Sequence, residues 1–122
     1  MPPRGSRLPD PLRELMPLTP AVFFILFALA DGEKHGYAIM QQVAELSDSK
    51  VRMGPGTLYT TIQRLLGLGA IEEIAMRDPE GRRRYYRLSG AGWLLLDAEF
   101  SRLVAVLRLA QRKKILPQGA QS

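Results

Sequence analysis

The sequence predicts a mostly α-helical domain that carries one small β-hairpin and ends in a long helix. Three features predict it: helical stretches that open with a proline or a capping residue, a turn signal between two β-rich runs, and a long apolar repeat near the end. The chain has 122 residues, which is enough for one modest hydrophobic core. We therefore expect a single compact unit.

Two helices are expected before residue 31. Asp10 is predicted to cap a short accessory helix within an N-terminal extension of residues 1–17. Thr19 is predicted to cap a second helix over Pro20–Ala30. Residues 21–30 are an unbroken apolar run of ten, too short to cross a bilayer that needs about 20. This second helix is therefore expected to be buried on nearly all sides.

The next two helices are predicted to be amphipathic. One spans Gly36–Leu46, and the other begins at Gly54 and Pro55 and closes near Gly67. Helical geometry separates the second helix into an inward apolar face of Leu58, Ile62 and Leu65 and an outward polar face of Thr57, Thr60, Gln63 and Arg64, with Tyr59 at the border. No acidic residue occurs from position 49 to 71, so this outward face favours an anionic partner.

An arginine-rich hairpin is predicted next. The sequence Asp78-Pro79-Glu80-Gly81 is a strong turn signal between a strand at Ile71–Arg77 and a second strand ending at Leu88. In the second strand, alternation places Arg84, Tyr86 and Leu88 on one face and Tyr85 and Arg87 on the other. Residues 82–87 hold four arginines, a cluster typical of phosphate contact. A solvated charged hairpin without a partner is the alternative.

The last helix is predicted over Gly90–Lys114, with Ser89 as its cap. Apolar residues repeat along it at heptad spacing, and further apolar residues lie outside that repeat. Together they present more apolar surface than one small core can bury. A second subunit is the expected cover, and we predict a homodimer interface at Leu96, Phe100, Leu103 and Leu107. The remaining residues, 117–122, are polar and are expected to form a disordered tail.

Composition excludes several classes of function. The chain has no cysteine and one histidine, His35, so it lacks disulfides, zinc-thiolate sites and the ligands for a histidine metal site. The acids are scattered and no glycine-rich phosphate loop is present, so we expect neither an enzyme nor a cofactor. His35 is expected to pack at or cap a helix start. A net charge of +5 favours anionic partners, and we expect a cytoplasmic protein without membrane attachment.

The order of these elements is that of a winged helix-turn-helix domain over residues 18–89, followed by a dimerisation helix over 90–116. The helix after Gly54 would enter the major groove of DNA, and the hairpin would be the wing beside it. Two functions fit this layout. One is sequence-specific DNA binding, and the other is a winged-helix protein interaction module without specific DNA readout. The salt dependence of binding separates them.

The chain resembles the PadR family of bacterial transcriptional regulators. The resemblance rests on the motifs His35-Gly36-Tyr37, Pro55-Gly56-Thr57-Leu58-Tyr59 with Arg64-Leu65 and Gly69, and Arg84-Tyr85-Tyr86-Arg87-Leu88-Ser89 with Gly92. It covers the chain from about Leu18 to the end of the last helix. It implies a homodimeric repressor whose C-terminal helix forms the dimer interface. Such a repressor binds an inverted repeat in double-stranded DNA.

The predicted DNA-binding residues come from the polar helix face and the wing: Thr57, Tyr59, Thr60, Gln63, Arg64, Arg82, Arg83 and Arg84. Gly54 stands where the family often has Ser or Thr, and Thr60 stands where proline is common, which adds a hydroxyl donor toward DNA. Some relatives bind flat aromatic effectors against a central tryptophan of the last helix. Here Trp93 lies at the helix start, so Trp93 is a candidate contact for a small apolar effector but not for an aromatic sandwich.

Overall fold

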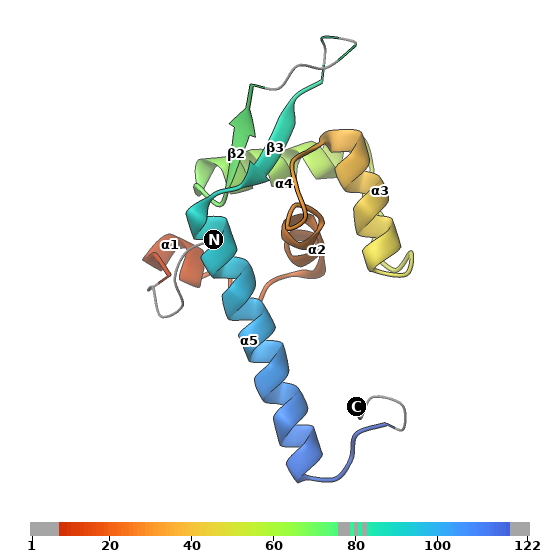
Figure 1. Ribbon diagram of the computed structural model, residues 1–122, viewed down its shortest axis with the longest axis vertical. Helices are drawn as coiled ribbons and strands as arrows, with labels where there is room; N and C mark the ends of the chain where they lie inside the picture. Colours follow the sequence, from red (N-terminus) through yellow and green to blue (C-terminus); the bar gives the residue numbers. More distant parts are fainter. Residues whose placement is uncertain (1–7, 76–78, 80, 82, 118–122) are drawn as a thin grey trace.

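The computed structural model describes residues 8–75, 79, 81 and 83–117 of the chain. The elements are α1 (Asp10–Arg13), α2 (Pro20–Ala28), β1 (Lys34–His35), α3 (Gly36–Leu46), α4 (Pro55–Gly67), β2 (Ile71–Ile74), β3 (Tyr85–Leu88) and α5 (Gly90–Arg112). Figure 1 shows α2 at the centre of the molecule, the β2–β3 hairpin at one end, and α5 running from beside the strands to the opposite end. The predicted helical domain with a small hairpin and a long last helix is confirmed.

The sheet contains one more strand than the sequence predicted. Its order is β1-β3-β2, and both pairs of neighbours are antiparallel. The two-residue strand β1 places His35 opposite Tyr85 of β3, and β2 places Ile71 opposite Leu88. The start of α3 is therefore hydrogen-bonded to the wing, although the two are far apart in the sequence.

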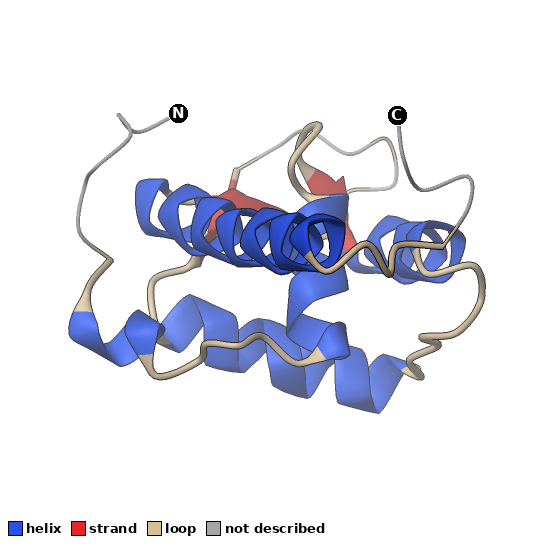
Figure 2. Ribbon diagram, turned by 90° about the horizontal axis from the view of Figure 1, so that it is seen from below, coloured by secondary structure: helices blue, strands red, loops and turns tan. Residues whose placement is uncertain are grey.

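The core forms where four helices and the sheet meet around α2. Figure 2, viewed from below Figure 1, shows the helices in front of the strands. Leu58, Ile62 and Leu65 of α4 are at most 1% exposed, as predicted for its inward face. The accessory helix α1 belongs to the same core, because Leu12 is 1% exposed. None of the helices within the described part of the chain is long and apolar enough to cross a membrane.

Several element boundaries differ from the predicted ones. Helix α2 ends at Ala28 rather than Ala30, and α5 ends at Arg112 rather than Lys114, where the chain takes a positive φ. Pro9, not Asp10, occupies the cap position of α1, and no side chain caps this helix. The strand expected at Ile71–Arg77 stops at Ile74, and residues 76–78, 80 and 82 of the predicted hairpin lie outside the described part.

The start of α5 is fixed against the turn that follows α4. Gly69 takes a φ of 76°, and the N–H groups of Gly69 and Ala70 donate to carbonyls of the last helical turn, as in a Schellman cap. The Ala70 carbonyl then accepts the N–H of Ser89 at 3.1 Å. Gly92 lies directly against that carbonyl, where an ideal Cβ would be 2.0 Å from the oxygen. Only glycine fits this approach.

A buried carboxylate joins the N-terminal segment to α5. Glu99 is 2% exposed, and its Oε2 accepts the backbone N–H of Leu18 at 2.6 Å. Its other oxygen forms an ion pair with Arg102 one turn later. These partners satisfy the buried charge, which would otherwise be costly. The sequence suggested only scattered acids, so this link was not predicted.

Candidate nucleic-acid interface

The outward face of α4 is polar and exposed, as the sequence predicted. Its exposed residues are Thr57, Tyr59, Thr60, Gln63 and Arg64. The helix begins at Pro55 after Gly54, which supplies no side-chain cap. Because the inward residues are fully buried, the orientation of α4 is fixed and its polar side chains are held toward solvent. This face is available to a large ligand.

The prediction that Thr60 offers a hydroxyl donor on this face is wrong. The Thr60 hydroxyl donates to the Gly56 carbonyl at 2.9 Å, one turn back along the helix. The Thr61 hydroxyl does the same to the Thr57 carbonyl at 2.9 Å. Thr60 therefore presents a methyl group and an acceptor oxygen to the outside, not the hydroxyl donor expected from the sequence.

The wing strand β3 alternates as predicted. Tyr86 and Leu88 are 1% and 6% exposed and face the core, whereas Arg87 is exposed and Tyr85 is half-buried. Burial raises the pKa of the Tyr86 phenol above its ordinary value of 10.0, and the nearby Glu73 carboxylate adds to this shift. The Tyr86 hydroxyl therefore stays neutral at physiological pH.

Two arginines of the cluster face acids on the neighbouring strand. Arg84 lies 3.6 Å from a Glu73 oxygen, and Arg87 lies 3.3 Å from a Glu72 oxygen. All four side chains are about half exposed or more, and such exposed pairs contribute at most about 1 kcal/mol. A phosphate group can therefore replace the carboxylate beside Arg84 at little cost. This pairing was not predicted, because it depends on the register between the two strands.

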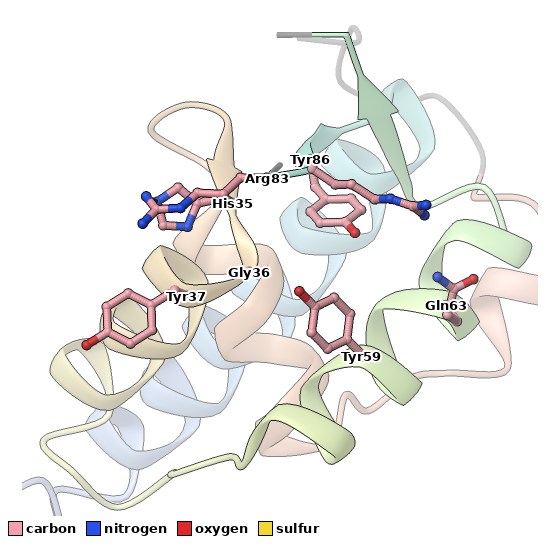
Figure 3. A pocket seen from close by; sticks show the side chains of 8 residues that line it. His35, Gly36, Tyr37, Tyr59, Gln63, Arg83 and Tyr86 are labelled. Atoms are coloured by element: carbon pink, nitrogen blue, oxygen red, sulfur yellow. Dashed lines mark hydrogen bonds between the residues drawn. The ribbon is translucent and has the colours of Figure 1, made fainter. Parts of the chain in front are cut away.

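The start of α3, the face of α4 and the wing meet around a pocket of about 370 Å³. Figure 3 shows it from close by, with the Tyr59 and Tyr86 hydroxyls turned toward one another. The pocket is lined by His35, Gly36, Tyr37, Tyr59, Gln63, Arg83, Arg84 and Tyr86. The fold thus brings four of the predicted site residues together from two elements. Thr57, Thr60 and Arg64 lie elsewhere on α4, and Arg82 lies outside the described residues.

His35 is the pocket residue whose role the sequence predicted only in part. Its Nδ1 accepts the N–H of Ala38 at 3.2 Å, so His35 caps α3, in agreement with the prediction. Its Nε2 lies 3.1 Å from an Arg83 nitrogen, and its ring meets Tyr85 edge to face at a centroid distance of 5.4 Å. The contact with the wing was not predicted. The strand β1 that produces it is too short to show a pattern in the sequence.

The predicted interface residues of α5 lie in different surroundings. Leu96 is 2% exposed within this single chain, and Phe100 packs edge-on against Phe23 and Phe27 of α2. Leu103 is half-buried, and Leu107 is 51% exposed. Leu96 therefore has almost no surface left for a partner, because the core of its own chain covers it. Trp93 is also half-buried against that core.

The described residues contain no cluster of three or more His, Asp or Glu side chains that could hold a metal ion. The pocket instead combines donors and cations: imidazole, phenol, amide and two guanidinium groups. Such a set recognises oxyanions rather than metals.

A family comparison identifies the relatives of this fold. The model of the transcriptional regulator PadR-like family matches residues 25–98, which include α3, α4, the wing and the start of α5. The chain belongs to the PadR-like family. The resemblance expected from the sequence motifs is therefore confirmed. PadR-like proteins are transcriptional regulators rather than enzymes, as the composition of the chain suggested.

Two curated proteins resemble part of the chain. The transcriptional regulator Rv3488 of Mycobacterium tuberculosis is 44% identical over 69 residues, which are 56% of this chain and 61% of Rv3488. An uncharacterized 37.1 kDa protein in transposon TN4556 of Streptomyces fradiae is 38% identical over 79 residues. These are 65% of this chain but only 21% of the transposon protein. The match therefore covers less than two thirds of either relative.

Solved PadR structures have the same fold. A PadR family transcription regulator from Clostridium difficile R20291 superimposes with a TM-score of 0.67 at 23% identity, over 77% of this chain and 97% of that protein. PadR of Bacillus subtilis, solved in complex with operator DNA, gives a TM-score of 0.58 at 22% identity, over 67% of this chain and 46% of that protein. The predicted winged helix-turn-helix fold is confirmed.

Proposed function

We propose that this PadR-like regulator is a cytoplasmic repressor that binds an inverted repeat in double-stranded DNA as a homodimer. The observation that carries the proposal is the shared pocket, where Tyr59 and Gln63 of α4 lie beside Arg83 and Arg84 of the wing. A duplex seated on the polar face of α4 would meet the wing arginines at the same time. The B. subtilis relative, solved with operator DNA, supports this use of the fold.

The two elements are proposed to have different roles. Exposed amide and guanidinium groups of α4 suit base edges in the major groove, where Gln pairs with adenine and Arg with guanine. We assign this readout to Gln63 and Arg64, with Thr57 and Thr60 flanking them. The wing residues Arg82, Arg83 and Arg84 would hold backbone phosphates, which fix position and affinity but carry no sequence information.

Homodimer formation is proposed to use the far half of α5. The far half of this helix leaves the body of the molecule, as Figure 1 shows. Val104, Val106, Leu107 and Leu109 are 44–51% exposed there. A helix with this much bare apolar surface gains free energy by burying it, at about 25 cal/mol per Å². The proposed contact centres on Leu103 and Leu107, since Leu96 is already covered.

Release by a small apolar effector is the last part of the proposal. An apolar molecule held between two α5 helices would change the spacing of the two α4 helices and so weaken binding to both half-sites. Trp93 is the single tryptophan of the chain and lies at the start of α5, so its fluorescence can report such binding. A change in Trp93 emission that parallels loss of DNA binding is the expected result.

The DNA arm of the proposal can be tested with a duplex selected from a randomised library. Gln63→Ala should relax preference at one base position, at a cost of about 1–3 kcal/mol. Arg83→Ala with Arg84→Ala should weaken all duplexes alike and lower the slope of log affinity against log salt by about 0.9 per lost phosphate contact. Lys113→Ala, at the far end of α5, is the matched control and should change neither. Binding that shows no salt dependence would point to the protein interaction module instead.

The dimer arm has its own test. Leu107→Glu places a charge in the proposed interface and should yield monomers in sedimentation experiments. Ser101→Glu introduces the same charge at an exposed position on the other side of α5 and should leave the dimer intact. A Leu107→Glu protein that sediments as the wild type does would place the interface elsewhere.

A further inference from the structure

The surroundings of His35 contain a hydrogen-bond conflict. A neutral imidazole has one acceptor nitrogen and one N–H donor, and arginine has donors only. His35 Nδ1 lies 3.2 Å from the N–H of Ala38, and Nε2 lies 3.1 Å from Arg83 Nη1. Both neighbours are donors, so the ring can accept from only one of them. If Nδ1 caps α3, then Nε2 carries its hydrogen and directs it at the guanidinium group.

The ring cannot simply turn away from this conflict. His35 is held in strand β1, opposite Tyr85 in the register with β3, and the edge of one ring meets the face of the other. Turning the ring would also remove the cap from the N–H of Ala38. The imidazole is therefore held at the junction between α3 and the wing, and the exposed Arg83 side chain is the group that approaches it.

An anionic oxygen placed between the His35 imidazole and the Arg83 guanidinium would remove the conflict between these two donors. It would accept from the His35 Nε2–H and from the Arg83 guanidinium together, so that two opposed donors become two hydrogen bonds to one acceptor. Space for such a group is present, because both side chains line the 370 Å³ pocket between α3, α4 and the wing (Figure 3). Arg84 lines the same pocket and adds positive charge.

We propose that His35 and Arg83 together bind one phosphate group of the DNA backbone. This rests on the proposed DNA binding and adds to it a neutral ligand from the start of α3. The bound phosphate fixes His35 as the Nε2–H tautomer with Nδ1 on Ala38. Occupation of the pocket by phosphate therefore secures the cap of α3 and the position of the wing in one step.

Two substitutions separate the cap from the phosphate contact. In His35→Asn, the amide oxygen takes the place of Nδ1 and keeps the cap, but nothing replaces Nε2. In His35→Gln, the amide nitrogen can take the place of Nε2, but glutamine is a poor cap. We expect His35→Asn to melt like the wild type and to bind the selected duplex about tenfold more weakly, with an unchanged salt slope because the lost donor is neutral. His35→Gln should melt lower and bind more tightly than His35→Asn.

A double substitution tests whether the two residues hold the same phosphate. Arg83→Gln should weaken binding and lower the salt slope by about 0.9. If one phosphate is shared, the combined variant should lose less affinity than the product of the two single losses. Losses that multiply would mean separate phosphates and would overturn the proposal, as would a His35→Asn protein that binds like the wild type.

The source of the phosphate can be read from the single histidine itself. Long-range ¹H–¹⁵N spectra report which ring nitrogen is protonated, and His35 gives the only histidine signal. The free chain should already show the Nε2–H pattern, and duplex should shift the Nε2 and Nε2–H resonances while the ring keeps that pattern. A response to duplex but not to inorganic phosphate identifies the DNA backbone as the source, and an equal response to both identifies a free phosphate site. If the wild-type chain binds no duplex, only the DNA function is refuted, because the titration with inorganic phosphate still tests binding by His35 and Arg83. If the His35 resonances change with neither duplex nor inorganic phosphate, the proposed phosphate site is refuted.

Discussion

Replacement of Gly92 by alanine should destabilise the fold, although alanine is the better helix former. The added Cβ would lie 2.0 Å from the carbonyl oxygen of Ala70, well inside van der Waals contact, and 3.2 Å from a Leu88 methyl group. The oxygen belongs to backbone and cannot swing aside as a side chain can. It also accepts the Ser89 N–H at 3.1 Å, and the Ala70 N–H is bonded to Leu65 at 2.9 Å. Helix α5 must therefore move away from the turn.

The size of the effect follows from two opposing terms. Overpacking that forces backbone shifts costs about 1–3 kcal/mol, and the rigid contact places this site near the upper end. The gain from alanine over glycine in a helix is about 1 kcal/mol. A net loss of about 2 kcal/mol remains. With an unfolding entropy of about 2.1 cal/mol/K per residue over the whole chain, that corresponds to a melting temperature lower by about 8 °C.

Gly90→Ala is the matched control for this measurement. Gly90 lies two residues earlier in the same helical turn, and its ideal Cβ has nothing within 4 Å. It should melt at or slightly above the wild-type temperature. Both variants should be followed by circular dichroism at one protein concentration, since association makes the melting temperature concentration-dependent. A Gly92→Ala protein that melts as high as Gly90→Ala would show that the close approach to Ala70 does not hold α5 in place.

Three further predictions concern single side chains. Glu99→Ala should cost about 2 kcal/mol of unfolding free energy, because the Leu18 N–H loses its charged acceptor. Glu99→Gln should cost less because an acceptor oxygen remains, and equal losses in denaturant melts would contradict this. Ser89→Ala should cost about 1 kcal/mol through loss of the α5 cap and of the bond to the Gly69 carbonyl, whereas Ser89→Thr should recover most of it in thermal melts. The raised pKa of Tyr86 means that the folded chain holds this proton more tightly than the unfolded chain, so its contribution is intact below pH 10.0 and is lost as pH rises above it. Tyr86→Phe should therefore lose stability less steeply at high pH than the wild type, and parallel denaturation profiles would refute this.

Local patterns in the sequence were sufficient for most of the helices. Helix α3 has the predicted bounds of Gly36–Leu46, and α4 begins at Pro55 as expected. Both have clear amphipathic faces and a start signal, which depend only on residues a few positions apart. The alternation of β3 was also predicted, since neighbouring side chains of a strand point to opposite faces. Tyr86 is consequently buried while Arg87 is exposed.

Contacts between distant segments could not be predicted in the same way. The carboxylate of Glu99 meets the backbone of Leu18 across 81 positions, and Arg83 meets His35 across 48. Periodicity and capping signals carry no information on such pairs, because these pairs form only when helices and strands have packed. The same reason explains why the ion pair between Arg84 and Glu73 in the folded wing was not predicted.

The sequence by itself determined the class of fold, the polar face of α4 and the PadR-like family, because these depend on local spacing and on short motifs. The tertiary structure decided which of those residues form one surface. Pairing of β1 with β3 brings the start of α3 to the wing and creates the pocket between them. Packing of the first half of α5 into the core buries Leu96, whereas Leu107 stays 51% exposed. Both outcomes depend on three-dimensional packing, because the packing of the core sets where the helices and strands that carry these side chains lie.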